Sequence, residues 1–284
     1  MKLAIYGSRR QEPYLEQIRS LLTLLDEASD EVVMHTKLYN YLLHLMPTAM
    51  KCVKRVTDSA DFVADAAVSI GGDGSFLRTA AWVGDKEIPI VGVNTGHLGF
   101  LASLSVDQLS TLPAMLAGGH YRTEARSLIE VDCPGLRGWP YALNEVAIAK
   151  GESASIIDVK ARIDGADLAD YRADGLIIAT PTGSTAYNLS VGGPIVQPTA
   201  PVMVLSPVAA HSLSLRPLVV GDTSVLTFTC DSRAGGFRIS VDGRSTDVAL
   251  DTRVTLRRAP FAVRVIMPEG SNFAATLREK LDWK

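Results

Sequence analysis

Apolar residues in the first 120 positions form short unbroken runs, and these runs alternate with segments of helical periodicity. The runs, which predict strands, lie at 3–6, 32–34, 67–70 and 88–93. The helical segments, where apolar residues recur every three or four positions, lie at 13–25, 38–46, 76–81 and 106–116. Strands that are apolar throughout and separated by helices are typical of a parallel sheet covered on both faces. The pattern therefore predicts a doubly wound α/β domain.

From about position 121 onward, apolar and polar residues alternate instead. The clearest strand-like segments lie at 157–163, 225–229 and 237–241. The turn dipeptides Asp164-Gly165 and Asp242-Gly243 follow the first and the last of these segments. Alternation with Asp-Gly turns is typical of antiparallel hairpins. We therefore predict a second, mostly antiparallel β-rich part, with the two halves meeting near Gly118-Gly119.

The composition of the chain indicates in which compartment the protein is expected more clearly than it indicates a function. Hydrophobic residues make up 47% of the chain, the formal net charge is −3, and no basic stripe is present, so we expect no nucleic-acid partner. Cys52, Cys133 and Cys230 lie far apart in no metal-ligand spacing, which predicts a reducing compartment and no metal held by the protein alone. No run of about 18 apolar residues predicts a membrane span, and the first residues predict a strand rather than a signal peptide. We therefore expect a cytoplasmic protein that does not bind membranes.

The segment Gly71-Gly72-Asp73-Gly74 is the first candidate site. It follows a predicted parallel strand and begins a predicted helix, which is where ligands bind in open α/β sheets. Glycines let backbone N–H groups approach a phosphate, and the helix N-terminus adds partial positive charge. The acid in this loop could accept a proton from an attacking hydroxyl or hold a magnesium ion. It could equally be an ordinary helix N-cap in a glycine-rich turn.

Two further segments contain clustered polar groups. The block 174–187 is an apolar strand followed by hydroxyls, glycine and Tyr187. Such groups suit a flat polar ligand such as a nucleotide, although a Thr/Ser-rich hairpin loop has the same composition. Asn144-Glu145, between two strand-like runs, could bind a ribose diol or occupy ordinary strand positions. His211 is a lone histidine of the kind that is more often structural, and both the Walker pattern and the GxGxxG fingerprint are absent.

Taken in order, these segments resemble the NAD kinases. The matching motifs are Gly71–Gly74, Asn94–Leu101, Asn144-Glu145, Asp174–Tyr187, Gly192–Pro194 and His211–Leu218. The similarity extends over roughly 65–245, with a looser match at both ends. Each motif alone is moderately specific, whereas the order and spacing of all of them are hard to attribute to chance.

The resemblance implies a fold, a reaction and partners. The expected fold is an α/β N-terminal domain at 1–120, a β-rich NAD-binding domain at 121–259, and a carboxyl-terminal segment, about 260–284, that returns to the first domain. The expected reaction transfers the γ-phosphoryl group of ATP to the adenosine ribose 2′-hydroxyl of NAD, giving NADP. Mg²⁺ would arrive with ATP, bound largely by phosphate oxygens and water. The resemblance also implies a homodimer or homotetramer.

The resemblance assigns roles to individual residues as well. Asp73 would be the general base on the ribose hydroxyl, a role typically worth about 10²- to 10⁴-fold in rate. Asn144 and Glu145 would hold ribose and base, and Asp174 would bind at the nicotinamide end. Gly74 would approach the dinucleotide with its backbone. The other candidates for substrate and nucleotide binding are Gly72, Arg172, Thr182, Thr185, Ala186, Tyr187, Asn188, Ser190, His211 and Arg244.

Two departures from the family pattern and two rival functions accompany this assignment. Arg244 stands where many family members carry a glutamine that touches the ligand, and the stretch 150–155 lacks the basic residue often found near Ser155. A lipid or sugar kinase could share the Gly-Gly-Asp-Gly loop, but is not expected to carry Asn144-Glu145 together with 182–187. A non-catalytic dinucleotide-binding sensor would keep the pocket residues without needing an acid at position 73.

Overall fold

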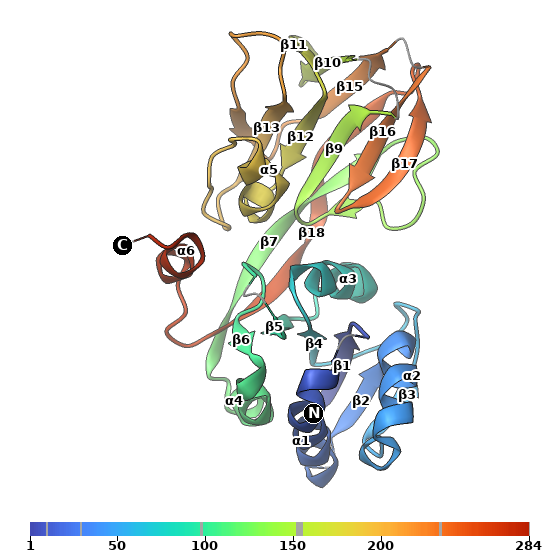
Figure 1. Cartoon of the computed structure of the whole chain (residues 1–284), viewed down its shortest axis with the longest axis vertical. Helices are drawn as coiled ribbons and strands as arrows, with labels where there is room; N and C mark the ends of the chain where they lie inside the picture. The colour runs from blue at the N-terminus through green and yellow to red at the C-terminus, as the bar shows by residue number, and fades with distance from the viewer. Residues whose placement is uncertain (10, 29, 97–98, 152–155, 233–234, 284) are drawn as a thin grey trace. The chain divides into compact units, whose positions relative to one another are not determined.

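Two compact units make up the chain in the computed structural model, which describes all residues except 10, 29, 97–98, 152–155, 233–234 and 284. The first unit contains 1–125 together with 263–284, and the second contains 126–262. Two long strands, β7 (Tyr121–Asp132) and β18 (Val254–Pro268), carry the chain from the first unit to the second and back (Figure 1). The C-terminal segment therefore returns to the unit that holds the N-terminus, as predicted.

The first unit is built on a parallel sheet. Its main strands are β1 (Lys2–Gly7), β2 (Glu31–Met34), β3 (Val53–Val56), β4 (Ala66–Ile70) and β5 (Ile90–Asn94). Their spatial order is β5-β4-β1-β2-β3, and every pair is parallel. The short β6 (Leu104–Ser105) and the end of β18 also run parallel to β5. The predicted α/β class of this part is confirmed.

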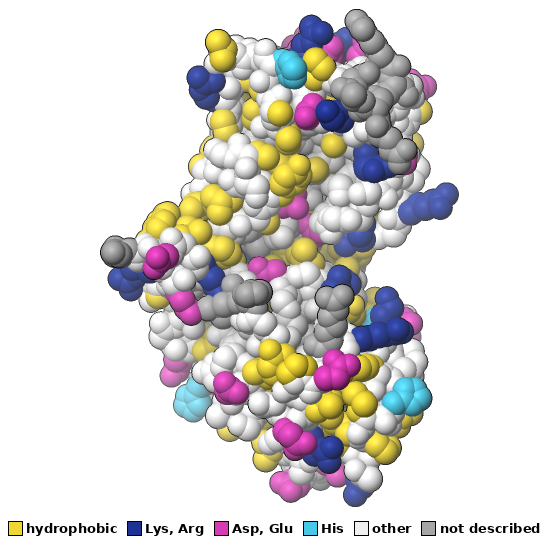
Figure 2. All heavy atoms as spheres, in the orientation of Figure 1, with side chains coloured by type: hydrophobic (Ala, Val, Ile, Leu, Met, Phe, Trp, Pro, Cys, Tyr) yellow, Lys and Arg dark blue, Asp and Glu magenta, His cyan; other side chains and the backbone are white. Residues whose placement is uncertain are grey.

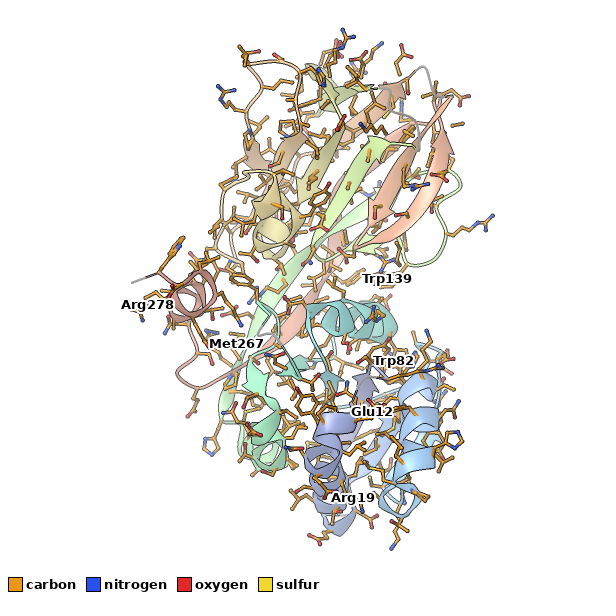
Figure 3. All side chains as sticks on the ribbon, in the orientation of Figure 1. Glu12, Arg19, Trp82, Trp139, Met267 and Arg278 are labelled. Atoms are coloured by element: carbon orange, nitrogen blue, oxygen red, sulfur yellow. The ribbon has the colours of Figure 1, made fainter. Side chains whose placement is uncertain are left out.

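Helices pack on both faces of this sheet. They are α1 (Leu15–Glu27), α2 (Thr36–Leu45), α3 (Asp73–Val83) and α4 (Leu112–Gly118). The C-terminal α6 (Phe273–Leu281) follows β18, and none of its residues is fully buried. Successive strand residues point to opposite faces, and Leu3 and Ile5 join the apolar cluster formed by α1, α2 and α4. Tyr6 points the other way, toward Trp82 of α3, which is labelled in Figure 3. This packing holds α3 against the sheet, and α3 begins just after the carboxyl end of β4.

Some elements of this unit differ from the prediction. The helix expected at 106–116 is divided into a 3-10 helix, η4 (Val106–Thr111), and α4, and Pro113 stands in the first turn of α4. The helix expected from position 13 begins with a 3-10 turn, η1 (Glu12–Tyr14), before α1, whereas the 3-10 turns η2 (Pro47–Ala49) and η3 (Gly84–Lys86) were not predicted. Neither was β3, whose residues are mostly exposed because it is an edge strand, so it lacks the apolar run that identifies the central strands.

The second unit consists of two antiparallel sheets. One has the order β14 (Leu218–Gly221), β13 (Val202–Val208), β12 (Gly175–Ala179), β9 (Glu145–Lys150), β16 (Gly236–Val241) and β17 (Arg244–Ala249). The other has the order β11 (Ala166–Ala173), β10 (Ile157–Ile163), β15 (Leu226–Asp231) and β18, and β8 (Tyr141–Ala142) pairs with β7. The predicted antiparallel, β-rich second part is confirmed.

The two sheets of the second unit share one apolar core. Alternate residues of β10, such as Val159, meet alternate residues of β9 and β12, such as Ile148 and Ile178, in a single buried cluster. The opposite face of β12 carries Ile177, which packs beneath the segment that contains η5 (Thr182–Thr185) and α5 (Tyr187–Ser190). The period-2 pattern read from the sequence is therefore the pattern of inward-facing side chains.

The surface carries mixed charge. On the face shown in Figure 2, acidic and basic side chains are interspersed among polar and apolar ones. Among the described residues, no helix combines the length and apolar character needed to cross a membrane.

Candidate functional site

The Gly71–Gly74 loop lies between β4 and α3 in the first unit. Gly71 has a φ of +145°, and a Cβ there would lie 2.3 Å from Ser75 Oγ, so only glycine fits this position. Its N–H donates to Val93 O of the adjacent β5 at 2.9 Å. Gly72 is the N-cap residue of α3, and its carbonyl accepts from Ser75 N at 2.8 Å. The strand pairing and the helix start together fix the backbone at the carboxyl edge of the sheet.

Asp73 is held by two backbone donors from the segment that follows β5. Its Oδ2 accepts from Phe100 N at 2.9 Å and its Oδ1 accepts from Leu101 N at 3.1 Å. The interpretation of Asp73 as an N-cap is wrong, because Gly72 is the cap and Asp73 is the first residue of the helix. The carboxylate is instead tied across the loop to the Asn94–Leu101 motif, of which His97 and Leu98 lie outside the described residues.

Gly99 makes that arrangement possible. A Cβ on Gly99 would lie 1.8 Å from Asp73 Oδ1 and 2.3 Å from its Cγ. The carboxylate therefore rests directly against the Gly99 backbone. In contrast, a Cβ on Gly72 would meet no atom within 4 Å, and one on Gly74 would be 3.8 Å from Arg78. The carboxylate of Asp73 is thus packed against neighbouring backbone, whereas the backbone at Gly72 and Gly74 has free space beside it.

In the second unit, Asp242 organises the segment that carries Asn144 and Glu145. Its carboxylate accepts from Leu143 N and Asn144 N at 2.8 Å each and from Glu145 N at 3.2 Å. Asp242 has a φ of +46° at the start of the turn between β16 and β17. Burial raises the pKa of Asp242, and the three N–H donors oppose that shift by stabilising the charged form.

Glu145 is largely buried beside Asp242. Burial raises the pKa of Glu145 to about 7, with a smaller contribution from the charge of Asp242, and a hydrogen bond from the Tyr187 backbone opposes the shift. Its Oε2 is shielded from solvent and has no hydrogen-bond partner among the described residues. A buried carboxylate oxygen without a donor is costly. Glu145 Oε2 therefore keeps an unused acceptor site.

The turn after β12 packs directly on Asn144. Thr180 N donates to Asn144 O at 2.9 Å, and the Thr180 hydroxyl donates to Leu143 O at 2.5 Å. A Cβ on Gly183 would lie 2.0 Å from Asn144 O, so this close approach needs glycine. Thr182 is buried, and its hydroxyl has no partner among the residues described. Glu145, Thr182 and Tyr187 thus gather at one end of β9 and β12.

The other candidates on this turn differ in exposure. Tyr187 and Ser190 are exposed, and Thr185 and Ala186 are half-buried. Asn188 is fully buried: its amide nitrogen donates to Ser184 O and Pro194 O at 3.1 Å each, and its oxygen accepts from Ser206 Oγ at 2.7 Å. In this structure Asn188 therefore holds the turn in shape rather than facing a ligand.

A further group lies at the opposite end of β12. Asp174 precedes the strand and pairs with Lys150 Nζ at 2.8 Å, while Arg172 lies 3.9 Å from Asp158. The N–H of His211 donates to Arg172 O at 2.9 Å. Six strand steps from Asp174 to Thr180, at about 3.3 Å each, separate the two ends by roughly 20 Å. The structure thus divides the candidates of this unit into two groups, and the stretch around Ser155 lies outside the described residues.

Arg244 is half-buried on β17. One of its terminal nitrogens, Nη2, donates to Tyr141 O at 3.0 Å and to Trp139 O at 3.2 Å. Burial lowers its pKa, and Asp242 opposes that shift. The guanidinium therefore joins the turn of β16 and β17 to the segment before β9.

Two functional features were missed by sequence reasoning. Asp242 was interpreted only as half of an Asp-Gly turn, and the backbone donors of Phe100 and Leu101 have no side-chain signature. Gly99 lies five residues beyond the end of β5 and inside the Asn94–Leu101 motif, but neither position shows that its backbone meets Asp73.

Comparisons with known proteins agree with this geometry. Two family models match: the ATP-NAD kinase N-terminal domain over residues 8–121 and the ATP-NAD kinase C-terminal domain over residues 143–267. The chain belongs to the NAD kinase family. The NAD kinase of Bacteroides fragilis is 41% identical over 285 residues, covering 100% of this chain and 98% of that protein. The NAD kinase of Porphyromonas gingivalis is also 41% identical, covering 99% and 98%.

Solved structures with the same fold include members of this family. The structure of an NAD kinase from Archaeoglobus fulgidus in complex with ATP has a TM-score of 0.75 at 25% identity, covering 99% of both chains. The structure of yeast NADH kinase complexed with NADH has a TM-score of 0.89 at 22% identity, covering 100% of this chain and 88% of that one. The second likeness is one of fold alone. The prediction of an NAD kinase fold and enzyme is confirmed.

Proposed function

We propose that the protein transfers the γ-phosphoryl group of ATP to the 2′-hydroxyl of the adenosine ribose of NAD, giving NADP and ADP. Asp73 carries the proposal together with membership of the NAD kinase family. A ribose hydroxyl is a poor nucleophile until its proton is leaving, so a fixed base beside it accelerates the transfer. Asp73 is fixed by Phe100 N and Leu101 N, and it keeps further lone pairs on both oxygens.

The 2′-hydroxyl gives its proton to Asp73 while its oxygen attacks the γ-phosphorus. The bond between that phosphorus and the oxygen bridging to the β-phosphorus breaks, and the electron pair leaves with ADP. Gly72 and Gly74 offer room for close approach, because a Cβ on Gly72 would meet no atom within 4 Å and one on Gly74 would meet only the flexible Arg78 guanidinium at 3.8 Å.

In the second unit, the group at one end of β9 and β12 would bind the dinucleotide. The unpartnered Oε2 of Glu145 can accept from a ribose hydroxyl, and the hydroxyl of Thr182 can donate to or accept from a polar edge. Asn144, Thr185, Ala186, exposed Tyr187 and Ser190 would line the same pocket, supported by Asn188. Asp174, Arg172 and His211 would meet the nicotinamide end, and Arg244 would shape the pocket through Tyr141.

Mg²⁺ would enter with ATP, where it neutralises charge on the phosphates. Mg²⁺ keeps several waters and takes few protein ligands, and the described residues contain no group of three His, Cys, Asp or Glu that could cage an ion. The donor set fits a metal that the nucleotide carries in. We also propose that residues 1–120 with 260–284 and residues 121–259 act as the two functional domains of a cytoplasmic homodimer or homotetramer.

The test is NADP formation by the purified protein with ATP, Mg²⁺ and NAD, detected with an NADP-specific dehydrogenase. Asp73→Asn should keep NAD binding and lower kcat by about 10²- to 10⁴-fold. No NADP formation, with phosphorylation of a lipid or sugar phosphate instead, would overturn the assignment. An unchanged kcat for Asp73→Asn would remove Asp73 from the base role.

A further inference from the structure

A cavity of about 290 Å³ lies inside the first unit, between the segment that follows β5 and the C-terminal helix α6. One wall is the segment 99–105, which includes the two backbone donors to Asp73. The other wall contains Met267, which is labelled in Figure 3, and residues of α6 up to Lys280. The cavity therefore borders the segment that fixes Asp73.

Most polar side chains of this cavity are already engaged. Ser103 donates to Ile266 O at 3.1 Å. Asn272 caps α6 by accepting from Ala275 N at 2.8 Å, and Thr276 donates to Asn272 O at 3.2 Å. These groups hold the walls together.

Lys280 is the exception. Its Nζ is shielded from solvent and has no hydrogen-bond acceptor among the residues that the structure describes. Burial lowers the pKa of Lys280, and the charges of Glu279 and Asp73 raise it. A buried ammonium with no acceptor is costly. Its presence beside the cavity indicates that an anionic group completes its hydrogen bonding.

Asp73 does not fill that need in this structure. It contributes charge to the surroundings of Lys280, but no hydrogen bond joins it to Lys280 Nζ, which has no partner among the described residues. The described residues therefore leave Lys280 Nζ able to donate to an anionic ligand. A lysine ammonium is a compact point charge suited to phosphate oxygens, and phosphoryl transfer depends on neutralising the charge of the moving group.

We propose that Lys280 contacts the terminal phosphoryl group of ATP as it is transferred. The proposal rests on the proposed function, since it takes ATP as the donor and Asp73 as the base. It adds a cation from the C-terminal helix, a segment outside the Gly-Gly-Asp-Gly loop and outside both family models. In this proposal Lys280 supplies a positive charge to the phosphoryl group, while Asp73 accepts the proton released in the same step.

The test compares Lys280→Met with Arg278→Met, a matched loss of one cation from the exposed surface of the same helix (Arg278 is labelled in Figure 3). Affinities are measured by calorimetry, with Mg²⁺, for a non-hydrolysable ATP analogue and for ADP. We expect Lys280→Met to weaken analogue binding and lower kcat by about 10- to 100-fold, as for a hydrogen bond to a charged group. ADP binding should change less than about twofold, Lys280→Arg should restore much of the loss, and Arg278→Met should match the wild type.

Equal losses of affinity for the ATP analogue and for ADP would mean that Lys280 has a structural role. Unchanged kcat and analogue affinity would mean that Lys280 has no role in the reaction, and either result overturns the proposal. Should Lys280→Met fail to fold, Lys280→Gln, which removes the charge but keeps a polar side chain, replaces it in the same measurements. Lys280→Gln should weaken binding of the ATP analogue more than binding of ADP, and equal losses for both would refute the contact. Failure of the proposed function itself is seen separately, as a wild-type protein that makes no NADP.

Discussion

The contact between Gly99 and Asp73 makes a quantitative prediction for Gly99→Ala. The new Cβ would lie 1.8 Å from Oδ1 and 2.6 Å from Oδ2 of Asp73. Non-bonded carbon contacts lie near 3.5 Å, so the carboxylate must move by roughly 1.5 Å or the loop must retreat by as much. Either movement breaks the hydrogen bonds from Phe100 N and Leu101 N.

The size of the effect follows from that displacement. Misplacing a catalytic group by about 1 Å costs on the order of 10²-fold, and complete loss of a general base costs up to about 10⁴-fold. We therefore expect Gly99→Ala to lower kcat by about 10²- to 10⁴-fold. Asp73 is only partly buried, so the two lost hydrogen bonds should cost only about 1–2 kcal/mol in the free energy of unfolding.

The assay is steady-state NADP formation, with urea unfolding to measure stability. Gly96→Ala is the matched control, because it lies in the same segment and its Cβ would meet no atom within 4 Å. It should keep kcat within about twofold of the wild type. Since Gly99 is a positioning residue that acts through Asp73, adding Gly99→Ala to Asp73→Asn should lower kcat little further. Full multiplication of the two losses, or a wild-type kcat for Gly99→Ala, would refute the reasoning.

Three other substitutions test the site. Gly74 lies in a helix with open space beside it, so Gly74→Ala should stabilise the protein by about 0.5–1 kcal/mol. The same substitution should raise the KM for substrate, and an unchanged KM would mean that no ligand approaches the backbone at position 74. The Cβ of Gly183→Ala would lie 2.0 Å from Asn144 O, so this substitution should lower the free energy of unfolding by about 1–3 kcal/mol and weaken NAD binding measured by calorimetry. If neither effect appears, the turn shifts freely and the close contact is not needed. The pKa of Glu145 is raised from 4.5 to about 7, so the folded state binds more protons between these values and stability should fall as pH rises through that window, by at most about 3 kcal/mol before solvent screening. Glu145→Gln should remove that slope from pH-dependent urea unfolding, and an identical slope in wild type and variant would contradict the raised pKa.

Much of the fold was predictable because the burial of a segment determines the pattern of apolar residues in its sequence. The central strands β1, β4 and β5 are buried on both faces and therefore read as continuous apolar runs. The edge strand β3 is mostly exposed and leaves no such run. Local signals of this kind report what a segment buries, so they cannot identify an element that buries little.

The site was predictable only in part, for a related reason. Asp73 is visible because an acid in a glycine-rich loop at a strand end is unusual. Asp242 is invisible, because Asp-Gly is also the ordinary signal for a hairpin turn, and its three N–H donors are about a hundred positions away in the chain. Asn188 shows the converse: it belongs to a polar motif, yet its amide serves internal hydrogen bonds.

In the proposed function, Asp73 and Glu145 have different tasks, and the structure holds their carboxyl groups in different ways. Asp73 already has backbone donors on both oxygens, so its carboxylate has a fixed direction before any substrate arrives. Glu145 has one oxygen with no donor among the described residues, and burial raises its pKa to about 7. A ribose hydroxyl that donates to Glu145 would stabilise the charged form and lower that pKa, so binding of NAD below pH 7 should release protons. If the proposed roles hold, the base is positioned by hydrogen bonds that are already made, whereas the dinucleotide is bound through an acceptor that is left open.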